Sequence, residues 1–256
     1  MPARRVRCPR TQSETQFATA AATQGLSENE EGLGKCEPVG SLPPMKNRAL
    51  SEATWILGTL AAGWLISLAL LPVLSILFAG LLLFTLYFFR DPERVPAGDE
   101  NTAVSAADGV VTTIDEVEEG EFLKTRVRRI GIFLSVFDVH VNRSPIAGEI
   151  THSEPKPGGF LDARDPQSSI LNQSRSWVIS APTGTVMVKQ ITGAIARRIC
   201  PWAVVGDKLK RGERFGMIRF GSRTEIFLPM SAEVLVKIGD RVRGGETPVA
   251  RLKPLS

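Results

Sequence analysis

The feature that most constrains this chain is a long run, residues 54–89, without a single charged side chain. One helix of that length would extend ~54 Å, well beyond the ~30 Å hydrocarbon core of a bilayer. Pro72 divides the run, and proline is tolerated at the start of a helix but breaks its interior. We therefore predict a hydrophobic hairpin of two helices, Thr54–Leu70 and 72–89, within a membrane-associating segment 45–90.

Basic residues flank the hairpin on both sides. Lys46 and Arg48 precede it, and Arg90 and Arg94 follow it. Positive charge at both ends of an even number of spans places both ends in the cytoplasm, so the predicted location is the cytoplasmic face of the cell membrane. The alternative is a hairpin buried inside a soluble protein, but core helices are seldom free of charge over such a length.

Residues 1–44 have a different composition, rich in Ser, Thr, Gln, Glu, Gly and Pro. A segment of this kind buries too little apolar surface to offset the entropy lost on ordering. It also lacks the apolar core of a secretory signal. We predict a disordered N-terminal extension, with Met45 as an alternative start of the chain.

From residue 91 to residue 256 the sequence changes to short runs rich in Val, Ile and Phe, separated by Gly, Pro, Asn and Asp. Such runs are typical of strands in an all-β domain. They lie at 109–114, 130–136, 177–179, 185–191, 215–220, 225–228 and 233–238. Residues 91–256 are therefore predicted to form one mainly β domain with few helices.

A weak internal repeat refines this prediction. Residues 205–213 and 238–246 share the order strand, Gly-Asp turn, short basic stretch and Gly-Glu turn. Two similar units of this kind suit a β-sandwich or a barrel-sandwich hybrid with approximate twofold symmetry.

Composition excludes several kinds of function. His140 and His152 are the only histidines, which rules out a multi-histidine metal centre, and the three cysteines show no paired spacing. We therefore expect no metal. There is one Tyr and no nucleic-acid reading motif, so we expect no nucleic-acid partner. The mild basic balance, a net charge of +4, favours an anionic lipid surface instead.

Two adjacent residues, Gly221 and Ser222, carry the most chemical interest. A Gly-Ser pair between two strands is most often a turn, and that interpretation stays open on these residues alone. Glycine lacks a Cβ, so a strained peptide at Gly221 can be approached closely by the Ser222 hydroxyl. Addition of that hydroxyl to the Gly221 carbonyl would replace an amide by an ester.

The stretch 219–229 resembles the processing site of the phosphatidylserine decarboxylases, in the short form found in bacteria and archaea. Three more segments resemble the same family, namely 88–96 directly after the hairpin, 105–111, and 133–148. All four follow in family order. The resemblance therefore covers everything from about residue 46 to the C-terminus.

This resemblance implies a carboxy-lyase that converts phosphatidylserine into phosphatidylethanolamine in phospholipid biosynthesis. The precursor would cut itself between Gly221 and Ser222, giving a β chain that ends at Gly221 and an α chain 222–256. Ser222 would become a pyruvoyl group, which forms a Schiff base with the lipid's serine amino group and takes up electrons as carbon dioxide leaves. The resemblance implies no metal or diffusible cofactor, and it is consistent with a homodimer.

The resemblance also assigns roles to single residues. Asp108 corresponds to the family aspartate that helps to orient a catalytic base, and His140 to the family histidine after Asp-X. Each has an ordinary alternative, a turn residue for Asp108 and a strand histidine for His140. Long-form members carry a second histidine where this chain has Arg143. Either His140 serves both cleavage and turnover, or Arg143 or Asp138 takes part.

Arg90, Arg143 and Arg223 are candidates for binding the lipid phosphate or carboxylate, because a guanidinium suits bidentate recognition of oxyanions. Two other functions stay open. One is decarboxylation of a different serine-headgroup lipid, such as an archaetidylserine, and the other is a non-catalytic membrane-anchored β-domain protein. A biotinyl or lipoyl carrier is disfavoured, because no Met-Lys-Met sequence occurs.

Overall fold

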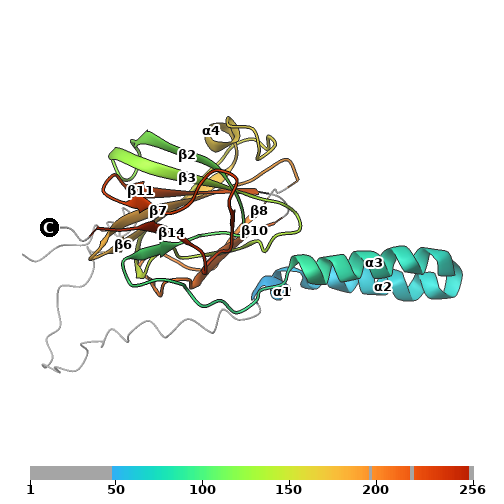
Figure 1. The fold of residues 1–256 in the computed structure, drawn as a ribbon. Helices are drawn as coiled ribbons and strands as arrows, with labels where there is room; N and C mark the ends of the chain where they lie inside the picture. The colour runs from blue at the N-terminus through green and yellow to red at the C-terminus, as the bar shows by residue number, and fades with distance from the viewer. Residues whose placement is uncertain (1–47, 196–197, 220–221, 254–256) are drawn as a thin grey trace, which may run out of the picture. The chain divides into compact units, whose positions relative to one another are not determined.

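The computed structural model describes residues 48–195, 198–219 and 222–253 (Figure 1). The predicted extension 1–44, Met45 and Gly221 lie outside these ranges. The helices are α1 (Arg48–Glu52), α2 (Thr54–Leu70), α3 (Pro72–Phe88) and α4 (Ser168–Leu171). The strands are β1 (Thr102–Val104), β2 (Gly109–Glu119), β3 (Thr125–Leu134), β4 (Val141–Arg143), β5 (Gly148–Lys156), β6 (Ser174–Ala181), β7 (Gly184–Ile191), β8 (Arg198–Pro201), β9 (Lys208–Leu209), β10 (Arg214–Arg219), β11 (Ser222–Pro229), β12 (Glu233–Val234), β13 (Arg241–Val242) and β14 (Pro248–Arg251). The predicted mainly β fold with few helices is confirmed.

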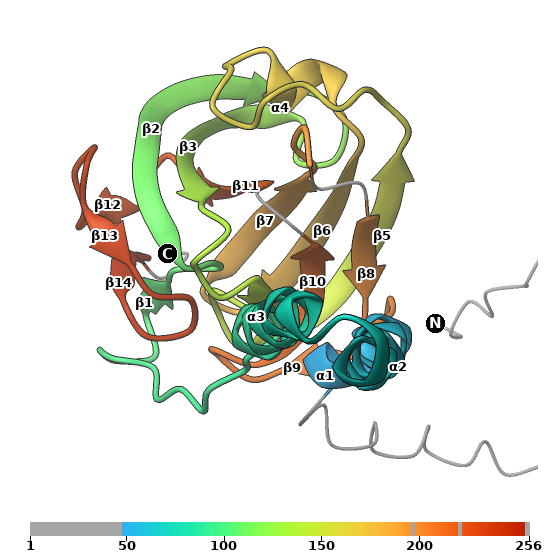
Figure 2. The ribbon, with the colours of Figure 1, turned by 90° about the vertical axis from the view of Figure 1, so that its right-hand side faces the viewer.

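The strands form one large sheet and two small ones. The large sheet has the order β13-β2-β3-β11-β7-β6-β5-β9, and the small sheets have the orders β4-β10-β8 and β1-β14-β12. Figure 2 shows how the large sheet curls. Trp177 of β6 packs on Phe215 of β10, with 5.2 Å between ring centroids, so the large sheet and the β4-β10-β8 sheet share one core.

The central strand of this architecture is β11, which pairs with β3 on one side and β7 on the other. Ser222 lies opposite Leu134, and Thr224 lies opposite both Ile132 and Gln190. Successive side chains of a strand point to opposite faces of the sheet. Both faces of β11 are covered, since its residues from Ser222 to Leu228 are buried. The first residue of β11, Ser222, therefore lies in the interior of the molecule.

Most predicted strands are found where the sequence places them. Those at 109–114, 177–179, 185–191 and 225–228 are confirmed within β2, β6, β7 and β11. The prediction at 233–238 is wrong after Val234, because a turn closes at Lys237. There Asp240 N donates to the Lys237 carbonyl at 3.1 Å, and Lys237 N donates to the Asp240 carboxylate at 2.8 Å.

The internal repeat has the same backbone geometry in both copies. Gly206 and Gly239, in the two Gly-Asp turns, have φ of 95°, and Gly212 and Gly245 have φ of 77° and 76°. Only glycine adopts this region without steric cost. The basic stretch of the first copy forms β9, which pairs with β5, and that of the second forms β13, which pairs with β2. The repeat thus recurs once at each edge of the large sheet.

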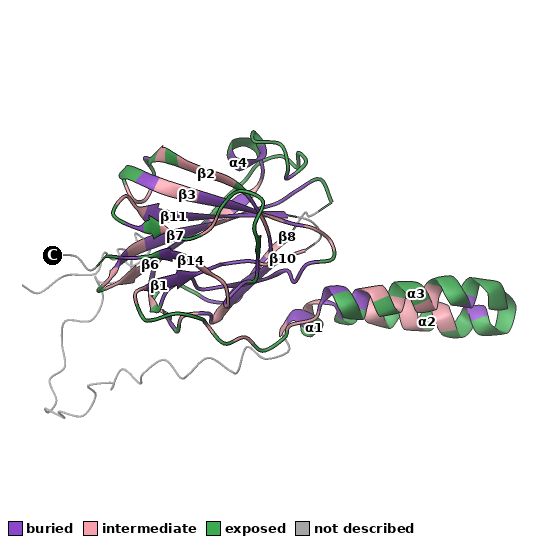
Figure 3. Cartoon of the chain, in the orientation of Figure 1, coloured by how far each residue is buried: buried purple, intermediate pink, exposed green. Residues whose placement is uncertain are grey.

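Helices α2 and α3 pack side by side and join at Leu71, with Pro72 at the first turn of α3. Their surfaces expose large apolar side chains over most of their length (Figure 3), including Leu70 and Val73 near the join. None of the helices in the described residues is both long enough and apolar enough to cross a membrane.

The C-terminal end of α3 lies against the β domain. Phe88 and Phe89 are fully buried. The Tyr87 hydroxyl donates to the Phe137 carbonyl at 3.2 Å, and Arg90 donates to the same carbonyl at 2.6 Å. The end of α3 is thereby attached to the loop that follows β3.

Candidate active site

Ser222 is the first residue of β11 and is fully buried. Its hydroxyl has no hydrogen-bond partner among the described residues. Buried polar groups are nearly always paired, because an unsatisfied one costs about 1–3 kcal/mol. Trp202 Nε1, Arg214 Nη2 and Arg219 Nε are also buried without a hydrogen-bond partner in the described part of the chain. The place of Ser222 at the start of a central strand makes its hydroxyl a candidate for chemistry. The predicted cleavage partner, Gly221, lies outside the described residues.

His140 is also fully buried, just before β4. Its Nδ1 lies 2.9 Å from the Asp138 carbonyl, and its ring packs on Phe88 with 4.3 Å between centroids. A neutral ring that donates through Nδ1 carries its basic lone pair on Nε2. The His140 carbonyl accepts from Ile218 N at 3.2 Å, which joins this segment to the strand that leads towards Ser222.

Asp108 lies in the turn before β2, apart from this core. Its carboxylate accepts from Arg94 at 2.9 Å and from Gly244 N at 2.7 Å. Burial raises the pKa of the Asp108 carboxyl above its usual range, against the opposing charge of Arg94. These contacts fix Asp108 between the segment after the hairpin and the second copy of the repeat.

A polar cavity of about 510 Å³ brings Asp108 together with Arg90 and Asp138. Its charged lining residues are Arg90, Glu93, Arg94, Asp108, Asp138, Arg241, Arg243 and Glu246. The Arg90 guanidinium lies 3.8 Å from the centre of the Tyr87 ring. Three of the four segments that resemble the decarboxylase family therefore contribute to one cavity, beside the end of α3.

Asp138 connects this cavity with His140. Its carboxylate accepts from Ser135 N at 2.9 Å and from Ser135 Oγ at 2.8 Å, and it pairs with Arg241 at 2.5 Å. Its backbone carbonyl is the partner of His140 Nδ1. Asp138 is thus placed to hold the orientation of the histidine ring.

Arg143 and Arg223 are both buried in ion pairs. Arg143 donates to Asp91 at 2.8 Å and to the Pro92 carbonyl at 2.7 Å. Arg223 donates to Glu225 at 2.8 Å, on the face of β11 away from Ser222. Side chains paired in this way fix the backbone around them, so the structure gives both arginines a structural task.

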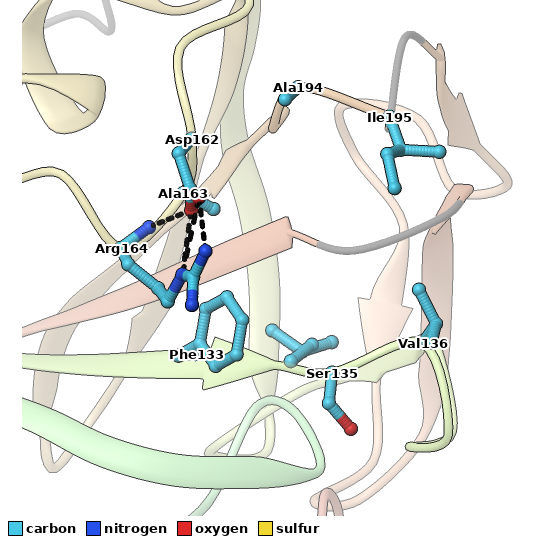
Figure 4. Close-up of a pocket in the computed structure, with 9 residues that line it drawn as sticks. Phe133, Ser135, Val136, Asp162, Ala163, Arg164, Ala194 and Ile195 are labelled. Carbon is cyan, nitrogen blue, oxygen red and sulfur yellow. Dashed lines mark hydrogen bonds and ion pairs between the residues drawn. The ribbon is translucent and has the colours of Figure 1, made fainter.

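A second, smaller cavity of about 250 Å³ lies next to Ser222. It is lined by Leu134, which is opposite Ser222 in the sheet, and by Phe133, Val136 and Ile195. Figure 4 shows the Arg164 side chain next to the Phe133 ring, with Val136 and Ile195 on the other side of this space. The Ser222 hydroxyl therefore lies beside a largely apolar pocket that is open to solvent and also has Asp162 and Arg164 in its lining.

The sequence matches the family model for phosphatidylserine decarboxylase over residues 81–250. The chain belongs to the phosphatidylserine decarboxylase family. The phosphatidylserine decarboxylase proenzyme of Symbiobacterium thermophilum is 45% identical over 210 residues, 81% of this chain and 98% of the relative. That of Pelobacter propionicus is 45% identical over 201 residues, 78% of this chain and 90% of the relative.

Several residues around this family site escaped sequence reasoning. Asn142 and Gln190 are fully buried polar residues near Ser222, and Glu225 is buried on the opposite face of β11. Polar residues within otherwise apolar strands could have marked these positions in the sequence. Their hydrogen-bond partners, however, come from distant parts of the chain. Within the described residues, no three His, Cys, Asp or Glu side chains gather as metal ligands would.

Proposed function

We propose that this protein decarboxylates phosphatidylserine to phosphatidylethanolamine with a pyruvoyl group that it makes from Ser222. The observation that carries the proposal is the fully buried, unpaired Ser222 hydroxyl at the start of β11. Membership of the phosphatidylserine decarboxylase family supports it, as do relatives named proenzymes. Asp108 and His140 are the proposed partners of Ser222.

Self-cleavage begins with the Ser222 hydroxyl. Its oxygen bonds to the Gly221 carbonyl carbon, the peptide C–N bond breaks, and the Ser222 nitrogen leaves as an amine. Loss of the Ser222 α-proton then expels the Gly221 carboxylate, and water releases ammonia from the remaining residue. His140 is the proposed base, because its ring is neutral and its segment pairs with the strand that leads to Ser222. Asp138 holds that ring through its carbonyl.

The surroundings of Ser222 fit a group of this kind. A pyruvoyl carbonyl accepts the electron pair released when carbon dioxide leaves an attached amino acid. Full burial of Ser222 keeps that position out of contact with solvent, and the largely apolar pocket lies beside it. Arg90, in the polar cavity at the end of α3, is our proposed contact for the lipid phosphate.

We also propose a finer description of the fold and its assembly. The curled sheet, the shared core and the repeat at both sheet edges support a barrel-sandwich hybrid. The β chain would end at Gly221, and the α chain 222–256 would stay bound through the pairing of β11 with β3 and β7. The homodimer that the resemblance implies stays a prediction.

Mass analysis of the purified wild-type protein tests this function. We expect two chains, the smaller beginning at residue 222 with a blocked N-terminus that reacts with phenylhydrazine. The preparation should also release phosphatidylethanolamine from phosphatidylserine vesicles. A single intact chain in active protein would contradict the pyruvoyl mechanism. Turnover of only an ether-linked serine lipid would instead identify a different lipid backbone, and cleavage without any turnover would contradict the enzyme assignment.

A pH profile of cleavage provides a test of His140. Burial lowers the pKa of His140 to about 4, so the ring is neutral and able to accept a proton at neutral pH. We expect the cleavage rate to stay level from about pH 8 to about pH 5 and to fall near pH 4. The measurement is the rate of precursor loss at each pH. A midpoint near ~6.5, the ordinary value for histidine, would contradict the assignment.

Folding stability must be followed in parallel. The folded-state pKa of His140 lies below the ordinary value, so the unfolded state binds the proton more readily. Stability is then fully present above about pH 6.5 and declines as the pH falls towards 4. A melting curve at each pH separates this loss from the loss of the base.

We further propose that the hairpin of α2 and α3 binds the membrane, which places the enzyme at the cytoplasmic face of the cell membrane. Its exposed apolar surface supports this role. Leu70 and Val73 lie at the join, the end of the hairpin farthest along the chain from Arg48 and Arg90, so an inserted hairpin carries them deepest into the bilayer. A charged side chain costs up to about 2.5–3.5 kcal/mol at the bilayer centre. We expect the double variant Leu70→Asp, Val73→Asp to lower the vesicle-bound fraction at least about tenfold in a flotation assay.

The matched control is Val95→Asp, which places a charge at an equally exposed valine outside the hairpin. This variant should bind vesicles as the wild type does. All three proteins should cleave themselves equally, because none of these side chains contributes to the site. If the double variant and the wild type had equal vesicle-bound fractions, the proposed role of the hairpin in membrane binding would be wrong.

A further inference from the structure

A buried polar side chain, Asn142 of β4, connects separate parts of the core. Its Nδ2 donates to Thr224 Oγ1 at 3.1 Å and to the Ala106 carbonyl at 3.3 Å. Its Oδ1 accepts from Gln190 Nε2 at 2.7 Å. Asn142, Gln190 and Thr224 are all fully buried. We call these three side chains the Asn142 bridge.

The direction of the bridge is fixed at one end by Trp177. The indole Nε1 can only donate, and it lies 2.7 Å from Gln190 Oε1. The Gln190 nitrogen must therefore face Asn142, and the Asn142 oxygen must face Gln190. This arrangement leaves the Asn142 nitrogen for Thr224 and for the Ala106 carbonyl, which can only accept. If the Asn142 amide were flipped, its nitrogen would face the Gln190 nitrogen and its oxygen would face the Ala106 carbonyl oxygen, and neither pair can form a hydrogen bond.

Each arm of the bridge ends two residues from a proposed site residue. Thr224 follows Ser222 on the same face of β11, because side chains two apart on a strand point the same way. Ala106 precedes Asp108, and Asn142 itself follows His140. The bridge therefore connects the three segments whose relative positions self-cleavage depends on.

The neighbouring strand leaves room for these amides. Gly216 of β10 lies opposite Asn142. A Cβ on Gly216 would come within 2.9 Å of the Cys200 carbonyl and 3.4 Å of Gln190 Nε2. Trp177 and Phe215 pack the two sheets together beside the bridge, and Gln190 accepts the hydrogen bond of the buried Trp177 indole.

We infer that Asn142 and Thr224 are positioning residues for self-cleavage, which hold the start of β11 in register with the segments of His140 and Asp108. The inference rests on the proposed cleavage at Ser222. The bond between Asn142 and Thr224 holds the backbone at the start of β11, from which the Ser222 side chain extends, and the Ser222 hydroxyl has no hydrogen-bond partner of its own among the described residues.

The test compares Thr224→Val with Thr224→Ser. Valine keeps the shape of threonine but removes the acceptor for Asn142, whereas serine keeps the hydroxyl and loses a methyl group. Positioning by hydrogen bond predicts cleavage at least about tenfold slower in Thr224→Val and within about threefold of wild type in Thr224→Ser. Pulse-chase translation with labelled methionine measures the rate, since Met230 labels the α chain.

A matched control is Ile226→Val on the same face of β11, which removes a methyl group without touching the bridge. It should cleave at the wild-type rate. Slower cleavage in Thr224→Ser than in Thr224→Val would indicate packing and overturn the inference. So would wild-type cleavage in Thr224→Val, or a Thr224→Val precursor that does not fold. A wild-type chain that never cleaves would overturn the proposed function and this inference with it.

Discussion

Ser222→Ala is expected to give one uncleaved chain with no decarboxylase activity. Alanine removes the only atom proposed to attack the Gly221 carbonyl, and it also removes the source of the pyruvoyl group. The loss should be complete within detection, because no other described hydroxyl occupies the start of β11. Intact-mass analysis and a phosphatidylethanolamine assay measure the two effects separately.

The fold should survive this change. The Ser222 hydroxyl makes no hydrogen bond within the described residues, so its removal leaves no partner unsatisfied. Alanine should leave the free energy of unfolding equal or slightly raised. Ser231→Ala, an exposed serine of the same α chain, is the control and should cleave normally. Two chains from the Ser222→Ala gene would refute the cleavage site.

His140→Gln is expected to slow self-cleavage by about 10²–10⁴-fold, the usual contribution of a positioned general base. Glutamine keeps a polar side chain of similar length but cannot take up the proton. The measurement is the half-time of precursor loss in a pulse-chase. His152→Gln is the matched control, because His152 is the other histidine of the chain and is exposed.

A second readout separates the two proposed tasks of His140. If His140→Gln cleaves at the wild-type rate but makes no phosphatidylethanolamine, the histidine acts only in turnover. If it cleaves and turns over normally, the assignment is wrong. The packing of Phe88 on the ring means that some stability is also at risk, so a melting curve must accompany both rates.

The sequence predicted those elements of the fold that depend on residues close together in the chain, namely strands and turns. Short β-branched runs predicted β2, β6, β7 and β11, because alternation and strand propensity are local properties. The Gly-Asp repeat was equally recognisable, since a turn with positive φ favours glycine, as at Gly206 and Gly239. The strand prediction failed at Lys237, whose backbone N–H donates to the Asp240 carboxylate in the turn that ends the run.

The site was less predictable, because its contacts join residues far apart in the chain. Arg143 looked like a candidate for phosphate binding or for the missing second histidine. Arg143 is buried against Asp91, about fifty residues away in the chain, and no local sequence pattern predicts that contact. The same holds for Asn142, whose side chain bonds to three different parts of the chain, at Ala106, Gln190 and Thr224. The residue types suggested what chemistry the site residues could perform, but only the three-dimensional structure identified the side chains that contact them.

The place of β11 has a consequence for how such an enzyme comes into being. A cut before Ser222 would release the end of a strand held on both sides, by β3 and by β7. The second copy of the repeat also lies beyond the cut, whereas the first copy lies before it. The two products would keep the strand pairing of the precursor, in which β11 pairs with β3 and β7, without having to associate as separate chains. If the bond before Ser222 broke only in a completed core, cleavage would itself depend on correct folding, and only a correctly folded precursor would become an enzyme.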